Sequence, residues 1–156
     1  MVDDARGDGD KLVNTLHQEN AALRERVADL EALAQHDPLT NIGNRRAFDI
    51  DLKKELERTR RIGYPTCLVL LDIDGLKDIN DSRGHPAGDA CLVYLALVLA
   101  EKVRKLDSVH RIGGDEFAIV LSASTAEAGS AVAQRIQSAP LAINHRGQEL
   151  MFRISI

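Results

Sequence analysis

A seven-residue repeat of apolar positions marks the first part of the chain. Leu16, Leu23 and Leu30 occupy one heptad position, and the other holds Val13, Asn20, Val27 and Ala34. Leucine at one position, with valine and a single asparagine at the other, favours a coiled coil of two parallel helices. We predict a dimerising coiled-coil helix over residues 11–36, after a disordered lead over residues 1–10. An amphipathic helix packed on its own domain is the alternative, because the repeat spans only about three heptads.

The pattern changes at His36-Asp37-Pro38, where the proline interrupts the helix. Beyond it, Asp37 and Thr40 are candidate helix caps. An amphipathic helix is predicted over residues 45–61, a fully buried strand over 66–72, a loop over 73–89 and an apolar helix over 87–105. Two strands over 108–112 and 116–121 flank a double glycine, which indicates a hairpin. A helix over 124–138, a turn over 144–147 and a last strand over 149–156 complete the pattern.

From residue 66 onward the predicted order is strand, helix, two strands, helix and strand. This order is typical of the split β-α-β arrangement of α+β folds, the ferredoxin-like or palm-type class with an antiparallel central sheet. In that topology the first strand is central and pairs with the second strand of the hairpin. Asp72 ends the first strand and Asp115 begins its partner, so we expect their two carboxylates to converge.

Composition narrows the classes of protein that this pattern allows. The 156 residues, 44% apolar and 28% charged, suit one soluble domain with an extra element. A net charge of -4 argues against a nucleic-acid partner. No apolar run is long enough to span a membrane and no secretory signal is visible, so a cytoplasmic location without a membrane partner is expected. Cys67 and Cys91 are predicted to be small buried side chains.

Two converging carboxylates beside a glycine-rich turn are suited to binding Mg²⁺ together with phosphate. Gly113 and Gly114 allow a ligand to approach the backbone closely, and Lys77 could neutralise charge on a triphosphate. The residues alone leave two interpretations open, namely metal-dependent phosphate chemistry or a structural carboxylate site.

Ordered blocks of residues resemble the GGDEF family of diguanylate cyclases. The blocks are Asp37-Pro38-Leu39-Thr40 with Asn44-Arg45-Arg46, then Asp72-Ile73-Asp74 with Lys77, Asn80-Asp81, Gly84-His85 and Gly88-Asp89, and finally Arg111-Ile112 before Gly113-Gly114-Asp115-Glu116-Phe117. The match covers residues 37–156, which are identified as a GGDEF domain. The family pattern continues with a glycine turn, a further helix and basic residues, so we expect a domain whose C-terminal part is missing.

The resemblance implies an enzyme that condenses two GTP molecules into cyclic di-GMP and releases pyrophosphate. The reaction takes place between the two domains of a homodimer, each of which holds one GTP. It implies Mg²⁺, with Mn²⁺ as a substitute, bound by Asp72, the carbonyl of Ile73 and Asp115. Asp115 would also be the base for the 3'-hydroxyl, Lys77 would stabilise charge in the transition state, and Glu116 would be a further metal or guanine-side ligand. The implied substrate-binding residues are Asn80 and Asp89 at the guanine edge, His85 nearby, and Gly113 and Gly114.

The resemblance also implies an inhibitory product site at Arg104 and Asp107, with Arg135 as a further contributor. The alternative function is a catalytically incompetent module that binds cyclic di-GMP through this Arg-x-x-Asp site. Some residues keep structural interpretations at this point: Asp74 as a loop cap, His85 as a turn residue and Arg111 as a solvated strand charge. An upstream sensor or receiver domain is expected, because the heptad ends three residues before Asp37.

Overall fold

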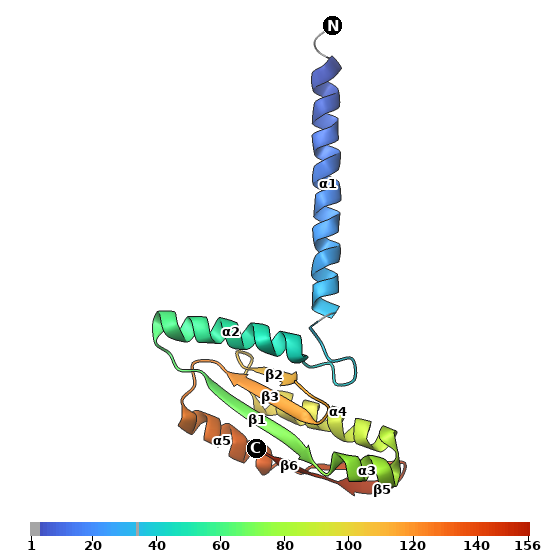
Figure 1. Ribbon diagram of the computed structural model, residues 1–156, viewed down its shortest axis with the longest axis vertical. Helices are drawn as coiled ribbons and strands as arrows, with labels where there is room; N and C mark the ends of the chain where they lie inside the picture. The colour runs from blue at the N-terminus through green and yellow to red at the C-terminus, as the bar shows by residue number, and fades with distance from the viewer. Residues whose placement is uncertain (1–3, 34) are drawn as a thin grey trace. The chain divides into compact units, whose positions relative to one another are not determined.

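The computed structural model describes residues 4–33 and 35–156, and the chain divides into two units, Met1–Ala34 and Gln35–Ile156. The first unit is one helix, α1 (Asp4–Leu33) (Figure 1). Helix α1 begins at Asp4, within the segment for which a disordered lead is predicted. Residues 1–3 and heptad position 34 lie outside the described residues.

The apolar side chains of the heptad in α1 are exposed. Their exposed fractions run from 49% to 65% for Val13, Leu16, Leu23, Val27 and Leu30. Among the described residues, no helix combines the length and the apolar character needed to cross a membrane.

A four-stranded antiparallel sheet forms the centre of the second unit (Figure 1). In spatial order its strands are β2 (Ser108–Arg111), β3 (Glu116–Leu121), β1 (Cys67–Asp74) and β6 (Arg153–Ser155). Strand β1 is central and pairs with β3 in a register that runs from Cys67 opposite Leu121 to Asp72 opposite Glu116. The predicted split β-α-β topology is confirmed.

The main core lies on one face of this sheet. Val69, Leu71 and Ile73 point inward there, against helices α4 (His85–Lys102) and α5 (Ala126–Gln137). On the opposite face Leu68 and Leu70 are 39% and 53% exposed, so the prediction of a strand buried on both faces is wrong.

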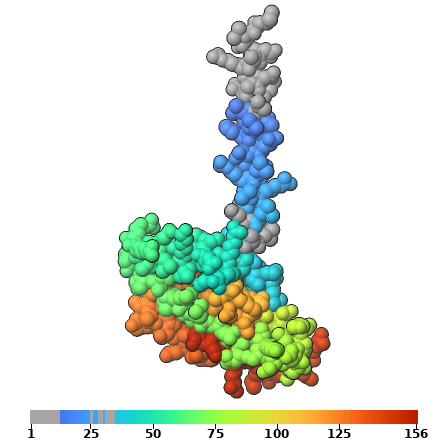
Figure 2. Space-filling view, viewed as in Figure 1, coloured from blue at the N-terminus to red at the C-terminus, as the bar shows by residue number. Residues whose placement is uncertain are grey.

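Helix α2 (Arg45–Ile62) covers only part of that second face, because Phe48 packs on Ala118 and Val120 of β3 and leaves β1 open. The space-filling view shows β1 reaching the surface between α2 and the red C-terminal residues (Figure 2). Helix α2 begins at its predicted residue, but its cap is Asn44, whose side chain accepts a hydrogen bond from the Ala47 N–H. The candidate caps Asp37 and Thr40 instead bond to each other in the preceding turn.

The loop predicted over residues 73–89 is mostly helical. Helix α3 (Leu76–Arg83) lies between Gly75 and Gly84, whose φ angles of 69° and 84° reverse the chain at each end. Helix α4 follows at once, with a proline in its first turn, where proline is well tolerated. The sequence pattern predicts a loop here because of its glycines and proline. In the structure, Gly75 and Gly84 bound α3, and the proline lies in the first turn of α4.

The last predicted strand is divided in two, and the strand before it was missed. Strands β4 (Ala142–His145) and β5 (Gln148–Met151) form a separate two-stranded sheet. Arg146 and Gly147, with φ angles of 54° and 81°, make the two-residue turn between them, the geometry that suits a tight hairpin. Phe152 then turns inward, and its N–H donates to the carbonyl of Leu141. This separates β5 from β6, which joins the main sheet.

Gly129→Ala tests the close contact of α5 with β1. A Cβ at this position would lie 2.3 Å from the Sγ of Cys67, whereas the next neighbours are at 3.5 Å or more. We expect the substitution to lower the free energy of unfolding by about 1–3 kcal/mol through overpacking. In a Cys67→Ala background the sulfur is gone, and the higher helix propensity of alanine should stabilise the protein by up to about 1 kcal/mol. Urea unfolding measures both, with exposed Ser130→Ala as control; equal effects in the two backgrounds would contradict this packing.

Candidate functional site

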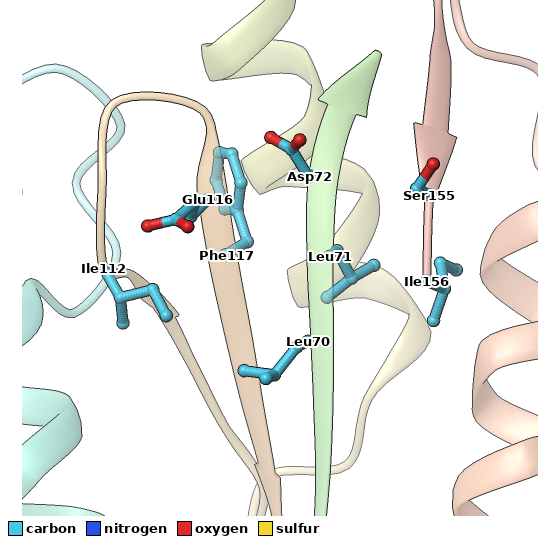
Figure 3. Close-up of a pocket in the computed structure, with 8 residues that line it drawn as sticks. All are labelled: Leu70, Leu71, Asp72, Ile112, Glu116, Phe117, Ser155 and Ile156. Atoms are coloured by element: carbon cyan, nitrogen blue, oxygen red, sulfur yellow. The ribbon is translucent and has the colours of Figure 1, made fainter.

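Three strands bring polar side chains into one row at the carboxyl end of β1. Asp72 lies opposite Glu116 of β3 on one side and opposite Ser155 of β6 on the other. Residues directly opposite each other in antiparallel strands project from the same face. Figure 3 shows this row bordering a pocket of about 300 Å³, which is lined by Leu70, Leu71, Asp72, Ile112, Glu116, Phe117, Ser155 and Ile156.

Asp115 belongs to the same cluster of acidic groups. It immediately precedes β3, and its carbonyl accepts a hydrogen bond from the N–H of Ile73 at 3.3 Å. Burial, followed by the negative charges of Asp115, Glu116 and Asp74, raises the pKa of Asp72 above its ordinary value. The structure thus brings together the two carboxylates for which strand order predicted convergence.

This cluster has the chemistry of a site for a hard cation. None of the ion pairs among the described residues involves Asp72, Asp74, Asp115 or Glu116, so the repulsion between them is not neutralised by a basic side chain. Within the described part of the chain, no group of three or more His, Cys, Asp and Glu side chains is arranged to hold a metal ion. Mg²⁺ commonly takes one or two carboxylates and completes its shell with water and phosphate oxygens. The oxygen donors present fit that mode of binding.

The loop between β2 and β3 is held by Arg111. Its Nη2 and Nε donate to the carbonyl of Gly114 at 2.7 Å and 3.2 Å, and its Nη1 donates to both carboxylate oxygens of Asp37. The Arg111 side chain is 15% exposed, so its interpretation as a solvated strand charge is wrong. Arg111 joins the turn that precedes α2 to the loop that carries Asp115.

Asp37 is well satisfied in this arrangement. Burial alone would raise its pKa, but hydrogen bonds from the Thr40 hydroxyl and N–H, together with the bond and charge of Arg111, bring the pKa below its ordinary value. The negative charge of Asp37 therefore stabilises the folded state.

The two glycines of the loop differ in their surroundings. A Cβ on Gly113 would lie 2.3 Å from Oε2 of Glu116, so the Glu116 side chain covers this residue. A Cβ on Gly114 would have no neighbour within 4 Å. Gly114 thus leaves open space beside Asp115, as expected where a ligand approaches the backbone.

The predicted nucleotide residues gather on α3 and α4. Lys77 lies in the first turn of α3, and His85 begins α4. Asn80 packs against α4 so closely that a Cβ on Gly88 would lie 2.1 Å from its Oδ1, which brings Asn80 beside the residue that precedes Asp89. The structure therefore assembles Asn80 and Asp89 at one helix–helix contact.

The predicted product site lies at the other end of β3. Asp107 accepts hydrogen bonds from the N–H groups of Arg104 and Ser122, at 2.9 Å and 3.2 Å, while Arg104 is exposed. The guanidinium of Arg135 donates to the carbonyl of Lys102 at the end of α4, close to Arg104 in the chain. Glu116 begins β3 and Ser122 directly follows its last residue, so the two lie six residue steps of about 3.3 Å apart. The predicted product site therefore lies roughly 20 Å from the acidic cluster.

Two polar contacts of the site were missed by sequence reasoning. Arg111 and Asp37 are 74 residues apart, so no local pattern links them. Asp74 accepts a hydrogen bond from the Ser155 hydroxyl at 2.7 Å, which replaces its interpretation as a loop cap. The predicted strand order, which leaves the last strand to pair with the central first strand, is a signal that could have found this second contact.

The palm-type sheet and its carboxylate cluster define a domain suited to metal-dependent nucleotide chemistry. The family model described as diguanylate cyclase, GGDEF domain, matches residues 34–156. The chain therefore belongs to the GGDEF family. Diguanylate cyclase DgcP of Pseudomonas aeruginosa is 39% identical over 127 residues, which are 81% of this chain and 19% of that protein. The chain thus spans about a fifth of the length of this curated relative.

Solved structures show the same fold. The coiled coil and GGDEF domain of DgcB from Caulobacter crescentus, in complex with c-di-GMP, matches with a TM-score of 0.79 and 27% identity, over 94% of this chain and 79% of that chain. Diguanylate cyclase SiaD from Pseudomonas aeruginosa, in complex with its activator SiaC, matches with a TM-score of 0.75 and 28% identity, over 97% of this chain and 59% of that chain.

Asp37→Asn tests the contribution of the Arg111 contact through its pH dependence. Because the folded pKa lies below the ordinary value of 3.8, the ionised carboxylate stabilises the fold fully above that value. This contribution is lost as the pH falls through the folded pKa. We expect Asp37→Asn to be less stable than the parent by about 1–3 kcal/mol at neutral pH, with a smaller difference below 3.8.

Urea unfolding over a series of pH values measures this difference. The control is Asp49→Asn on α2, where an exposed pair with Arg45 should contribute less than about 1 kcal/mol. A destabilisation of Asp37→Asn that does not change with pH would contradict the role of the ionised carboxylate.

Proposed function

We propose that this domain condenses two GTP molecules into cyclic di-GMP and releases two pyrophosphates. The observation that carries the proposal is the convergence of Asp72 and Asp115 at one end of paired strands. The predicted nucleotide residues lie on α3 and α4, the two helices that follow β1 in the chain. Membership of the GGDEF family and relatives named diguanylate cyclases support it. A module that only binds cyclic di-GMP is not favoured, since Asp72, Lys77, Asp115 and Glu116 are all present.

The proposed metal is Mg²⁺, with Mn²⁺ as a substitute, held by Asp72, Asp115 and the carbonyl of Ile73. When bound, it would neutralise charge on the phosphates and polarise the phosphorus under attack. Asp115 takes the proton of the 3'-hydroxyl, and that oxygen then attacks the α-phosphorus of the second GTP. Lys77 stabilises negative charge that accumulates on the leaving pyrophosphate. Glu116, which covers Gly113, holds the loop and adds an oxygen ligand on the same side.

Guanine is the base that this site is proposed to select. Its edge presents both donors and acceptors, and Asn80 offers an amide with both properties while Asp89 accepts from the N–H groups. The close contact of Asn80 with Gly88 orders these groups relative to each other. His85 begins α4 beside them, and Gly113 and Gly114 leave the backbone of the loop accessible to the nucleotide.

Two domains are needed for this reaction, because each GTP supplies the hydroxyl that attacks the other. The exposed apolar heptad of α1 supports a homodimer, since such a stripe is buried when two helices form a coiled coil. The likeness to DgcB extends over 94% of this chain, and that structure contains a coiled coil with its GGDEF domain. Dimerisation through α1 would set how the two sites meet.

Incubation with GTP and Mg²⁺ tests the reaction, with cyclic di-GMP and pyrophosphate detected by chromatography and a coupled phosphate assay. Asp115→Ala should reduce the rate at least about a thousandfold, because it removes a metal ligand and the base together. Asp81→Ala, an exposed change on α3, is the control and should leave the rate within about twofold. An Asp115→Ala variant with full activity would exclude the mechanism, and the absence of product from the chain extended to a full domain would exclude the function.

Product inhibition is the proposed role of Arg104 and Asp107, with Arg135 as a further contributor. The two carboxylate oxygens of Asp107 are fixed by backbone N–H groups, and the exposed guanidinium of Arg104 is free to pair with a phosphate or guanine edge. The distance from the acidic cluster means that product bound here does not compete directly with GTP.

Arg104→Ala should weaken inhibition by added cyclic di-GMP about tenfold or more, because a charge-assisted contact is lost. The uninhibited rate should stay close to that of the parent. Lys105→Ala, which changes the adjacent exposed charge, is the matched control. Unchanged inhibition in Arg104→Ala would show that this site does not bind the product.

A further inference from the structure

Edge strand β6 places a basic side chain on the same face of the sheet as the carboxylate cluster. Arg153 lies opposite Asp74 in the register, and Ser155 lies opposite Asp72. Ile154, between them, packs against the main core. Because successive side chains of a strand point to opposite faces, Arg153 and Ser155 share the face that carries the carboxylates.

The hydrogen bond from Ser155 to Asp74 supports this placement. The 2.7 Å bond between Oγ and Oδ1 joins side chains of neighbouring strands on that face. It also gives Asp74 a neutral partner on β6. Arg153 is exposed, and its guanidinium makes none of the hydrogen bonds or ion pairs found among the described residues. It is therefore free to bind an anion.

The chain that follows Asp74 is a suitable place for a phosphate group. Asp74 is followed by Gly75, and this glycine is the N-cap of α3 without a side-chain hydrogen bond to the helix. The first N–H groups of α3 are therefore not satisfied by a capping side chain, and such N–H groups favour phosphate. Lys77 lies in the first turn of the same helix. Arg153 lies on the neighbouring strand opposite Asp74, the residue that precedes Gly75.

We propose that Arg153 binds the triphosphate of GTP, together with Lys77 and the start of α3. The inference rests on the proposed function, because it names a contact within the same nucleotide site. Charge is the physical reason. Four carboxylates surround the end of β1, and a triphosphate placed there requires positive charge besides that of the metal. A guanidinium provides two parallel donors that match phosphate oxygens.

A different role for Arg153 would be that of a solvated charge on the surface of the domain, which is the usual environment of arginine. That role predicts no dependence on nucleotide phosphates, so the number of phosphates separates the two roles.

Calorimetric binding of 3'-deoxyguanosine tri-, di- and monophosphate with Mg²⁺ tests the proposal, because these nucleotides lack the attacking hydroxyl and do not condense. Arg153→Ala should bind the triphosphate about tenfold more weakly. The loss should be smaller for the diphosphate and absent for the monophosphate. Arg153→Lys, which keeps the charge, should retain most of the affinity. Arg60→Ala, an exposed arginine of α2, is the control and should bind all three as the parent does.

Unchanged triphosphate binding in Arg153→Ala, or an equal loss for all three nucleotides, would overturn the proposal. Arg153→Gln provides a second neutral variant of similar length, and thermal unfolding checks that each variant is folded. If the chain extended to a full domain makes no cyclic di-GMP but the triphosphate binding of the parent still depends on Arg153, the contact stands and the cyclase function fails. A parent chain that binds none of the three nucleotides would overturn both.

Discussion

The antiparallel pairing of β1 with β3 is the constraint on which the rest of the site depends. The register that places Asp72 opposite Glu116 also brings Asp115, one residue earlier, to the end of β1. A shift of one residue in this register would turn every side chain of β1 to the other face of the sheet. The apolar side chains would then leave the core, and Asp72 would leave the acidic cluster. The inward residues Val69, Leu71 and Ile73 oppose that shift, because they are buried on the core face. Hydrophobic packing on one face thus maintains the electrostatic arrangement on the other.

Repulsion among the carboxylates of the acidic cluster raises the free energy of the folded domain. Hydrogen bonds around the cluster offset part of this cost. Burial, followed by the crowded negative charges, raises the pKa of Asp72, so the ionised carboxylate opposes folding at neutral pH. The bond from Ser155 to Asp74 and the clamp of Arg111 on Gly114 hold the neighbouring backbone in place nevertheless. Arg111 is itself balanced by Asp37, whose lowered pKa acts in the opposite sense. The domain therefore keeps a repulsive arrangement that a cation can relieve.

Sequence reasoning predicted the parts of this fold that depend on periodicity and on chain order. The pairing of β1 with β3 followed from topology, and the helices around Phe48 and Val132 followed from their apolar faces. The apolar run over residues 66–72 predicts burial on both faces, but Leu68 and Leu70 are exposed, because such a run does not show which face a neighbour covers. The glycines and the proline over residues 73–89 predict a loop, but residues 76–83 are helical, because glycine and proline mark helix boundaries as well as loops. Strand β4 has only four residues, too few to show a period. Arg111 and Asp37 meet only through tertiary structure, and local sequence carries no signal of it.

The pairing of β6 with β1 has a consequence for the folding of the domain. Asp74 and Ser155, which share a hydrogen bond, are 81 residues apart in the chain, so their contact closes a long loop. Closing such a loop costs conformational entropy, which contacts between neighbouring residues largely avoid. The hydrogen bond between Ser155 and Asp74 therefore depends on the packing of the whole second unit, whereas the β2–β3 hairpin that carries Asp115 is local in the chain.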